Sequence, residues 1–97
     1  MKRIGAYVIL EGRFSHSFRK GSEVLSVSMH INTATLWVLE GSDPKAGTEK
    51  RNFICVDDAR GVAINEETEK LKYVGCFTKN VGPPYNALTY HVFEILR

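Results

Sequence analysis

The stretch from Lys79 to Asn86 has the strongest potential for ligand chemistry in this sequence. It combines a lysine, two asparagines, two consecutive prolines and one large aromatic residue. A lysine can pair with a phosphate, an asparagine offers a donor and an acceptor to a base edge, and a tyrosine ring can stack on a base. We therefore predict a ligand site at Lys79, Asn80, Tyr85 and Asn86. The simpler interpretation is an ordinary proline-containing loop.

Two arginines on other predicted strands are further candidates for phosphate contacts. Arg19 and Arg51 each lie on a strand flanked by loops, and a guanidinium group can bind phosphate through two parallel hydrogen bonds. We include Arg51 in the predicted site, where it would neutralise a phosphate together with Lys79. Both arginines could equally be solvated surface residues.

The other reactive residues form no recognised catalytic or metal-binding motif. The three histidines lie in separate predicted strands without the spacing of metal ligands. Adjacent acidic residues point apart in a strand or a helix, so the two acidic pairs do not predict acid–base chemistry. Phosphate-binding loops, dinucleotide fingerprints and nucleophile elbows do not occur. We predict a protein that is not an enzyme and that needs no metal or cofactor.

The two cysteines, Cys55 and Cys76, lie far apart in the sequence and outside any Cys-x-x-Cys spacing. This arrangement supports neither a zinc site nor a redox pair. Both residues fall in apolar strand contexts, so we predict buried thiols. A disulfide between them is disfavoured because no export signal accompanies the pair.

Charge and hydropathy narrow the range of partners. The 97 residues include 13 basic and 11 acidic side chains, with a formal net charge of +2, which predicts no long nucleic acid partner. The apolar run after the basic start ends at Glu11, too early for a signal peptide. No stretch approaches the ~20 apolar residues that span a bilayer. We expect a cytoplasmic protein, inside a host cell, with no membrane association.

Alternating apolar and polar residues, interrupted by turn signals, predict seven short strands and one helical turn. The predicted strands are Ile4–Leu10, Arg13–Arg19, Glu23–Ile31, Thr35–Leu39, Lys50–Asp57, Lys72–Thr78 and Leu88–Leu96. Asn65 would cap the helical turn, which ends at Lys70. The pattern predicts an all-β fold, namely a small antiparallel β-sandwich or barrel-like domain that spans residues 1–97.

Two of these strands are expected at the centre of the assembly. The strands of Trp37 and Phe93 are apolar on both faces, so each needs cover on both sides, and we predict a homo-oligomer. The short connection Asn32–Ala34 predicts a hairpin between the third and fourth strands. Because strands that follow each other in the sequence usually pair, we also predict that the Trp37 strand pairs with Lys50–Asp57.

Five short segments resemble the pattern of a family of small tailed-phage proteins of unassigned activity. They are Leu25-Ser26-Val27, Leu36-Trp37-Val38-Leu39, Arg51-x-Phe53, Tyr73-Val74-Gly75 and His91-Val92-Phe93-Glu94. This likeness covers about Lys20 to Glu94, and it implies the fold more than the mechanism. In size and style the chain is also similar to viral sponges, oligomers that bind cyclic nucleotide immune signals and so blunt bacterial antiviral defence.

The resemblance and the chemistry of the 79–86 stretch together predict a phage anti-defence sponge. In this hypothesis the protein sequesters a small nucleotide-like signal, without turnover, near a boundary between subunits. The alternative is a structural or protein-binding phage accessory protein that docks a host or virion protein through Tyr85 and the prolines.

Overall fold

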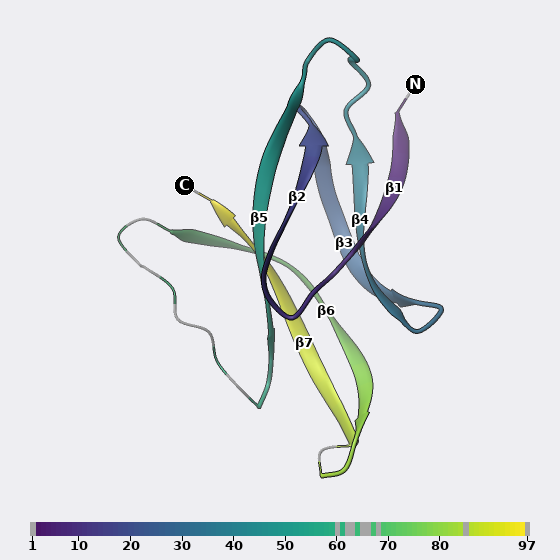
Figure 1. Cartoon of the computed structure of the whole chain (residues 1–97), viewed down its shortest axis with the longest axis vertical. Coiled ribbons are helices and arrows are strands. Elements are labelled where there is room, and N and C mark those ends of the chain that lie inside the picture. The colour runs from purple at the N-terminus through teal and green to yellow at the C-terminus, as the bar shows by residue number, and fades with distance from the viewer. Residues whose placement is uncertain are drawn as a thin grey trace.

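The structure is a computed structural model that describes residues 2–59, 61, 64, 67, 69–84 and 86–96. It confirms the all-β prediction, and no helix occurs among these residues. The strands are β1 (Arg3–Val8), β2 (Gly12–Arg19), β3 (Glu23–His30), β4 (Thr33–Glu40), β5 (Thr48–Asp57), β6 (Lys70–Gly82) and β7 (Asn86–Leu96), as Figure 1 shows. The helical turn was predicted over residues 66–70 with Asn65 as its cap. Residues 65, 66 and 68 lie outside the described residues, and Lys70 begins β6 instead of ending a helix.

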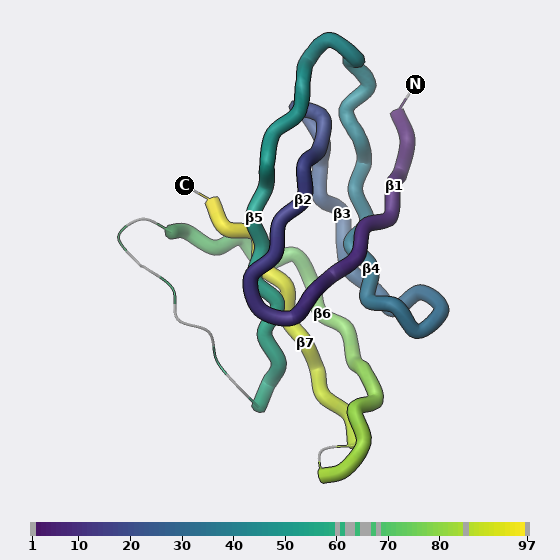
Figure 2. Tube along the Cα trace, viewed as in Figure 1, coloured from purple at the N-terminus to yellow at the C-terminus, as the bar shows by residue number. Residues whose placement is uncertain are grey.

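The strands form two antiparallel sheets that pack against each other, consistent with a small sandwich. One sheet has the order β1-β4-β3 and the other the order β2-β5-β7-β6. Their facing sides bury a core with Leu36 and Val38 from the first sheet and Phe53 and Val92 from the second. The trace in Figure 2 follows the chain from β1 to the long β6–β7 hairpin, whose tip lies at the lower end of the molecule.

The predicted pairing of the Trp37 strand with Lys50–Asp57 is wrong. The strand that carries Trp37, β4, pairs with β1 and β3, whereas β5 pairs with β2 and β7. The connection from Gly41 to Gly47 is long enough to cross from one sheet to the other. The two strands that are apolar on both faces, β4 and β7, lie inside different sheets and do not pair with each other.

The β3–β4 hairpin is present, although its turn differs from the prediction. Ile31 and Asn32 form the turn, with φ angles of 48° and 62°, as a two-residue hairpin connection requires. The register of β3 also shifts between Val24 and Ser26. The alternation in the predicted strand Glu23–Ile31 places Leu25, Val27, Met29 and Ile31 on the core face. Because of the bulge and the turn, Leu25 and Ile31 are exposed instead.

The two faces of β7 have different surroundings. Leu88, Tyr90, Val92 and Glu94 are buried and point between the sheets. The intervening side chains lie on the outer face of the sheet, where Tyr73 of β6 contacts both His91 and Phe93.

Candidate functional site

The predicted binding stretch 79–86 is mostly strand. Lys79 pairs with Leu88 and Asn80 with Ala87 in the β6–β7 ladder, and a bulge precedes the turn. Lys79, Asn80 and Asn86 are exposed at the end of the hairpin. Tyr85, which was predicted to stack a base, lies outside the described residues.

The hairpin residues do not share one side of the ladder. Lys79 lines a cavity of about 30 Å³ together with Glu11 and Tyr90, whereas Asn80 is the next residue along the strand and points to the opposite face. The cavity has room for about one water molecule and not for a nucleotide. Within one chain, the described part of the hairpin is therefore a protruding ladder with little concave surface.

Arg51 lies at the other end of β7 from the hairpin tip. Its Nε and Nη2 donate to the two carboxylate oxygens of Glu94, at 2.6 and 2.8 Å, and its Nη1 donates to the carbonyl of Ser22 at 2.7 Å. Glu94 follows Asn86 by eight positions, which corresponds to roughly 26 Å along an extended strand. This placement corrects the predicted site, because one chain cannot bring Arg51 and Lys79 to the same phosphate.

A larger cleft, of about 450 Å³, lies where the edge strands β1 and β2 meet. The ring of Tyr7 on β1 packs edge-on against Phe18 on β2, with the ring centroids 4.8 Å apart. The residues that line the cleft are Arg3, Tyr7, Ser17, Phe18, Arg19, Glu40, Gly41, Ser42 and Thr48. Its volume falls in the range of small-molecule sites.

A carboxylate with two donors occupies part of this cleft. The hydroxyl of Tyr7 donates to Glu40, and Nε of Arg3 donates to Oε2 of Glu40 at 3.0 Å. These hydrogen bonds, that of Tyr7 first and that of Arg3 second, lower the pKa of Glu40. Burial and the same carboxylate raise the pKa of Tyr7. At neutral pH Glu40 is therefore ionised, Tyr7 is a neutral donor, and the charge of Arg3 is largely compensated.

Arg19 adds a second cation to the cleft. No described residue accepts a hydrogen bond from its guanidinium, and its charge acts on Glu40 only at a distance. Two arginines against one carboxylate give the lining a net positive charge, and the hydroxyl groups of Ser42 and Thr48 add hydrogen-bonding capacity. The cleft is therefore suited to a small anionic ligand that also carries hydroxyl or amino groups.

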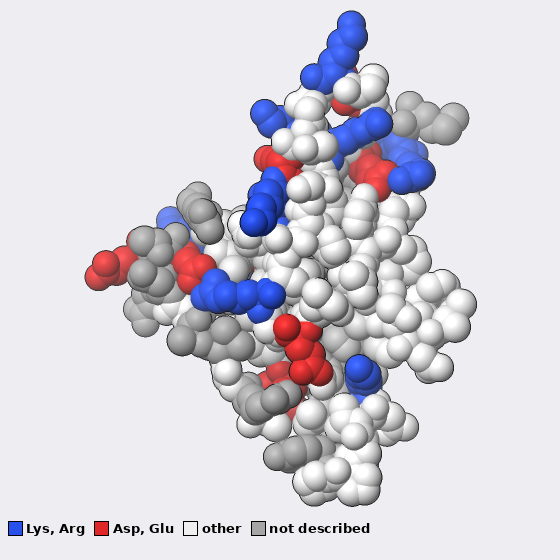
Figure 3. Space-filling model, viewed as in Figure 1, with Lys and Arg blue, Asp and Glu red and all other residues white. Residues whose placement is uncertain are grey.

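The surrounding surface is basic but not uniformly so. Figure 3 shows Lys and Arg gathered at the upper end of the molecule, where β1 begins and β2 ends, with acidic side chains among them. The basic residues at this end include Lys2, Arg3, Arg19, Lys20, Lys45 and Lys50. The mixture favours a small anion over an extended polyanion.

A second hollow, of about 230 Å³, has the opposite electrostatic character. It is lined by Glu11, Cys55, Asp57 and Tyr90, among others, and the hydroxyl of Tyr90 donates to Glu11 at 3.1 Å. Burial, with Glu11 and Asp57 nearby, raises the pKa of Cys55 to about 11. The thiol is therefore neutral, as expected of the predicted buried cysteine, and the two carboxylates disfavour an anion.

Sequence reasoning identified one residue of the cleft, Arg19, and missed the others. Arg3, Tyr7 and Glu40 come from strands that are remote in sequence and meet only through the β1–β4 ladder and the packing of the two sheets. The one available signal was the loop of glycine, proline and short polar residues after Glu40, because loops on rigid strands often carry binding sites.

The histidines are placed separately in the structure. Nε2 of His16 lies 2.7 Å from the carbonyl of Val8, His30 contacts the ring of Trp37, and His91 contacts Tyr73. Within the described ranges, no three side chains of the metal-binding types come together.

No protein-family model, curated protein or solved structure gave a significant match to this chain. The part of the chain that the structure describes contains no helix able to span a membrane.

Proposed function

We propose that this protein binds and sequesters a small, phosphate-bearing, nucleotide-like ligand without converting it, and that the cleft between β1 and β2 is the binding site. The observation that carries the proposal is the guanidinium of Arg19. It has no hydrogen-bond acceptor among the described residues, and it lies with Arg3 on the lining of a cleft of about 450 Å³. A phosphate supplies the acceptors that a guanidinium requires.

The remaining groups of the cleft match the rest of such a ligand. Glu40 can accept hydrogen bonds from a sugar hydroxyl or from the amino group of a base, and Ser42 and Thr48 can donate or accept. The cleft itself presents guanidinium groups, hydroxyl groups and one ionised carboxylate. This lining supports binding, and the proposal assigns no chemical step to it.

The biological role that we propose follows from the resemblance to phage proteins. In that setting the protein would be an anti-defence sponge that holds a cyclic nucleotide signal inside the host cell. Binding at the predicted hairpin site, Lys79, Asn80 and Asn86, is the competing location for the same function, and it would need a second subunit to enclose the ligand.

Calorimetry and thermal shift against cyclic dinucleotides and cyclic ADP-ribose isomers test this function. A ligand with Kd ~1 μM, present at ~100 μM, should stabilise the fold by about 2.7 kcal/mol. Chromatography should recover the ligand intact after incubation. A panel without any shift, or steady loss of the ligand, contradicts sequestration.

Two sets of variants locate the site. Arg19→Gln should weaken binding about tenfold or more, because it removes a charged partner of the phosphate. Lys79→Gln and Asn80→Ala at the hairpin should leave the affinity unchanged. Unchanged affinity in Arg19→Gln, with weaker binding in Lys79→Gln and Asn80→Ala, would support the same function with the ligand bound at the hairpin.

A protein-docking role is the second candidate, and the shape of the β6–β7 hairpin favours it. The hairpin reaches the lower end of the molecule in Figure 1, with Val81 exposed near its tip and Pro83 and Pro84 exposed in its turn. Protruding apolar residues of this kind can anchor a partner. Val81→Lys should then abolish recovery of a stoichiometric host or virion protein while Arg19→Gln does not.

A further inference from the structure

The outer face of the β6–β7 hairpin brings together three titratable side chains that the cleft does not use. Cys76 on β6 lies directly opposite His91 on β7, so their Cβ atoms are about 5 Å apart on the same face of the sheet. The hydroxyl of Tyr73 lies 3.0 Å from Nδ1 of His91, and a hydrogen-bonding interaction with Cys76 raises the pKa of Tyr73. The three side chains therefore form one cluster on the outer face of the hairpin.

Packing of the aromatic rings holds Tyr73 in this position. Its ring lies edge-on to Phe93, with the centroids 5.2 Å apart, and 5.9 Å from the ring of His91. The position of its hydroxyl is therefore set by two neighbours on β7 and does not depend on the thiol alone.

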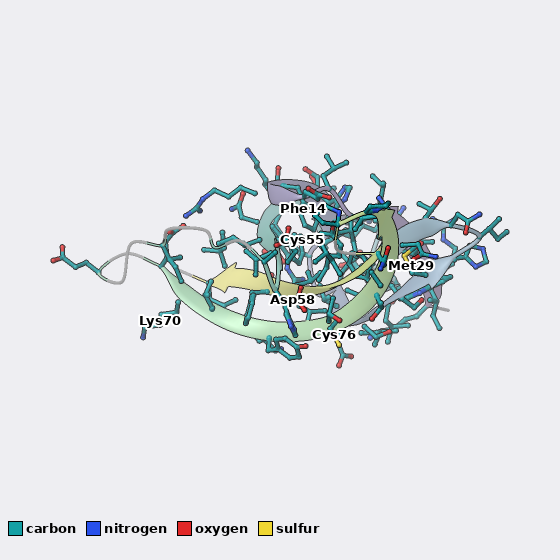
Figure 4. All side chains as sticks on the ribbon, turned by 90° about the horizontal axis from the view of Figure 1, so that it is seen from below. Phe14, Met29, Cys55, Asp58, Lys70 and Cys76 are labelled. Atoms are coloured by element: carbon teal, nitrogen blue, oxygen red, sulfur yellow. The ribbon has the colours of Figure 1, made fainter. Side chains whose placement is uncertain are left out.

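The two cysteines differ in accessibility, which corrects the prediction that both are buried. Cys55 is buried between the sheets, whereas Cys76 is exposed, and both thiols are free. Figure 4 shows Cys55 within the molecule and Cys76 directed outward from β6. A reagent in solution can therefore reach Cys76 while Cys55 serves as a shielded internal reference.

The three groups form a chain along which a proton can move. When His91 is neutral with Nδ1 as the acceptor, the thiol of Cys76 can donate to the oxygen of Tyr73 and the hydroxyl of Tyr73 to Nδ1. Transfer of both protons leaves a thiolate that accepts a hydrogen bond from Tyr73 and an imidazolium that donates one to it. The thiolate is the nucleophilic form of cysteine, and an adjacent imidazolium stabilises it.

We propose that Cys76 is a redox-sensitive modification site, activated by His91 through the hydroxyl of Tyr73, and that its reactant is a small hydroperoxide. The sulfur attacks one oxygen of the peroxide, so that an S–O bond forms as the O–O bond breaks. The leaving alkoxide or hydroxide takes up the proton held by His91. The sulfur is oxidised by two electrons to sulfenic acid, and the peroxide is reduced to an alcohol or to water.

This inference is independent of the cleft and of ligand sequestration. It describes a stoichiometric modification and not a catalytic cycle, since nothing in the cluster returns the sulfenic acid to the thiol. The neighbours along the outer face are mostly uncharged, with Val56 opposite His91 on β5, and Thr78 and Thr89 next along the hairpin. The backbone N–H of Asp58 donates to the carbonyl of Thr89, which brings one carboxylate to the border of this face.

Competition labelling tests the proposal on the folded protein. Hydrogen peroxide is added, and the sulfenic acid that forms is trapped with dimedone and located by mass spectrometry. Its rate of formation is compared with the rate at which hydrogen peroxide oxidises glutathione. Cys76 should react roughly threefold faster or more, because a gain in thiolate outweighs the accompanying loss of nucleophilicity. Cys55 should remain unlabelled until the protein is unfolded, which verifies that each variant is folded.

Three variants distinguish the proton relay from mere exposure of the thiol. Tyr73→Phe removes the bridging hydroxyl, and His91→Gln keeps an acceptor for Tyr73 but cannot take up a proton. Both variants should slow the oxidation of Cys76 to the rate of glutathione. In the wild type, alkylation of Cys76 should remove the ultraviolet absorbance of its thiolate. Both variants should lack this absorbance before alkylation. Thr89→Val, a matched change on the same face, should alter neither readout. Wild-type Cys76 that reacts no faster than glutathione, or equal rates in all variants, would overturn the proposal.

Discussion

Arg51 and Glu94 form a bidentate ion pair that joins the centre of the four-stranded sheet to the chain at Ser22. The side chain of Glu94 is only 6% exposed and that of Arg51 19% exposed. The guanidinium also lies over the ring of Phe18, 5.8 Å from its centroid. An arginine that was predicted to bind phosphate thus forms part of the fold, and its charge is already compensated.

The first prediction concerns this ion pair. Glu94→Gln removes the negative charge and leaves the guanidinium partly buried beside a neutral amide, which should lower the free energy of unfolding by about 2 kcal/mol. Urea unfolding at neutral pH measures the change. Arg3→Gln, which breaks the exposed pair of Arg3 with Glu40, is the control and should lower the free energy of unfolding far less, because water screens an exposed pair. Equal losses of stability in Glu94→Gln and Arg3→Gln would mean that burial does not strengthen the Arg51–Glu94 pair.

The second prediction concerns the close approach of β6 to β3 at Gly75. A Cβ atom at this position would lie 3.0 Å from Cγ2 of Val27 and 3.6 Å from its backbone nitrogen. Gly75→Ala should therefore destabilise the fold by roughly 1–3 kcal/mol, because the sheets must separate or Val27 must shift.

Two further variants check that explanation. Gly61→Ala meets no atom within 4 Å and should change stability little. The double variant Val27→Ala/Gly75→Ala should be more stable than the sum of the two single effects predicts, because the clashing methyl group is gone. Strict additivity in thermal unfolding would place the cost of Gly75→Ala elsewhere.

The sequence was sufficient for the strands because their burial follows a two-residue period. Leu88, Tyr90 and Val92 alternate along the predicted strand Leu88–Leu96, and all three side chains are buried in one core. The β3 strand shows the limit of this signal. The bulge between Val24 and Ser26 shifts the alternation by one residue, and nothing in the local sequence marks where it occurs.

The site was harder to predict because it depends on which strands become neighbours. Lys79 and Arg51 were combined by chemistry alone, and the pairing of β5 and β6 with β7 places them at opposite ends of one strand. Tyr7 and Glu40 carry no local motif and meet only because β1 pairs with β4. Long-range pairing decides both outcomes, and periodicity does not encode it.

The third prediction is the pH dependence of the contact between Tyr7 and Glu40. The pKa of Glu40 is lowered in the folded protein, so its contribution is present above the unfolded-state pKa of about 4.3 and is lost as the pH falls through the lower, folded value. The difference in stability between the wild type and Glu40→Gln should shrink as the pH is lowered from 7 toward 3. Urea unfolding at several pH values measures it, and a difference that stays constant would exclude a special role for the ionised carboxylate.

The fourth prediction is a homo-oligomer formed through the outer face of the β1-β4-β3 sheet. Ile4 is 58% and Val8 47% exposed on this face, and the register places Ile4 beside Leu39 and Ala6 beside Trp37. An apolar sheet face of this kind is typical of an interface.

Light scattering tests this assembly. The wild type should be larger than a monomer at micromolar concentration, and Ile4→Lys or Val8→Lys should dissociate it. Val81→Lys changes an exposed residue near the tip of the β6–β7 hairpin, on the other sheet, so it should leave the assembly intact. A monomeric wild type would show that the face is not used for self-association.

The last prediction uses Glu40 to locate the ligand site. In the cleft its carboxylate repels a phosphate, so Glu40→Gln should strengthen binding of a cyclic dinucleotide about fivefold, which corresponds to roughly 1 kcal/mol for one partly screened charge. This outcome differs from the usual effect of changing a binding residue, which is a loss of affinity. Calorimetry at neutral pH measures it, with Glu23→Gln as a control that removes an equal charge from β3, outside the cleft lining. Equal affinities for both variants, together with weaker binding after Lys79→Gln, would move the ligand from the cleft to the β6–β7 hairpin.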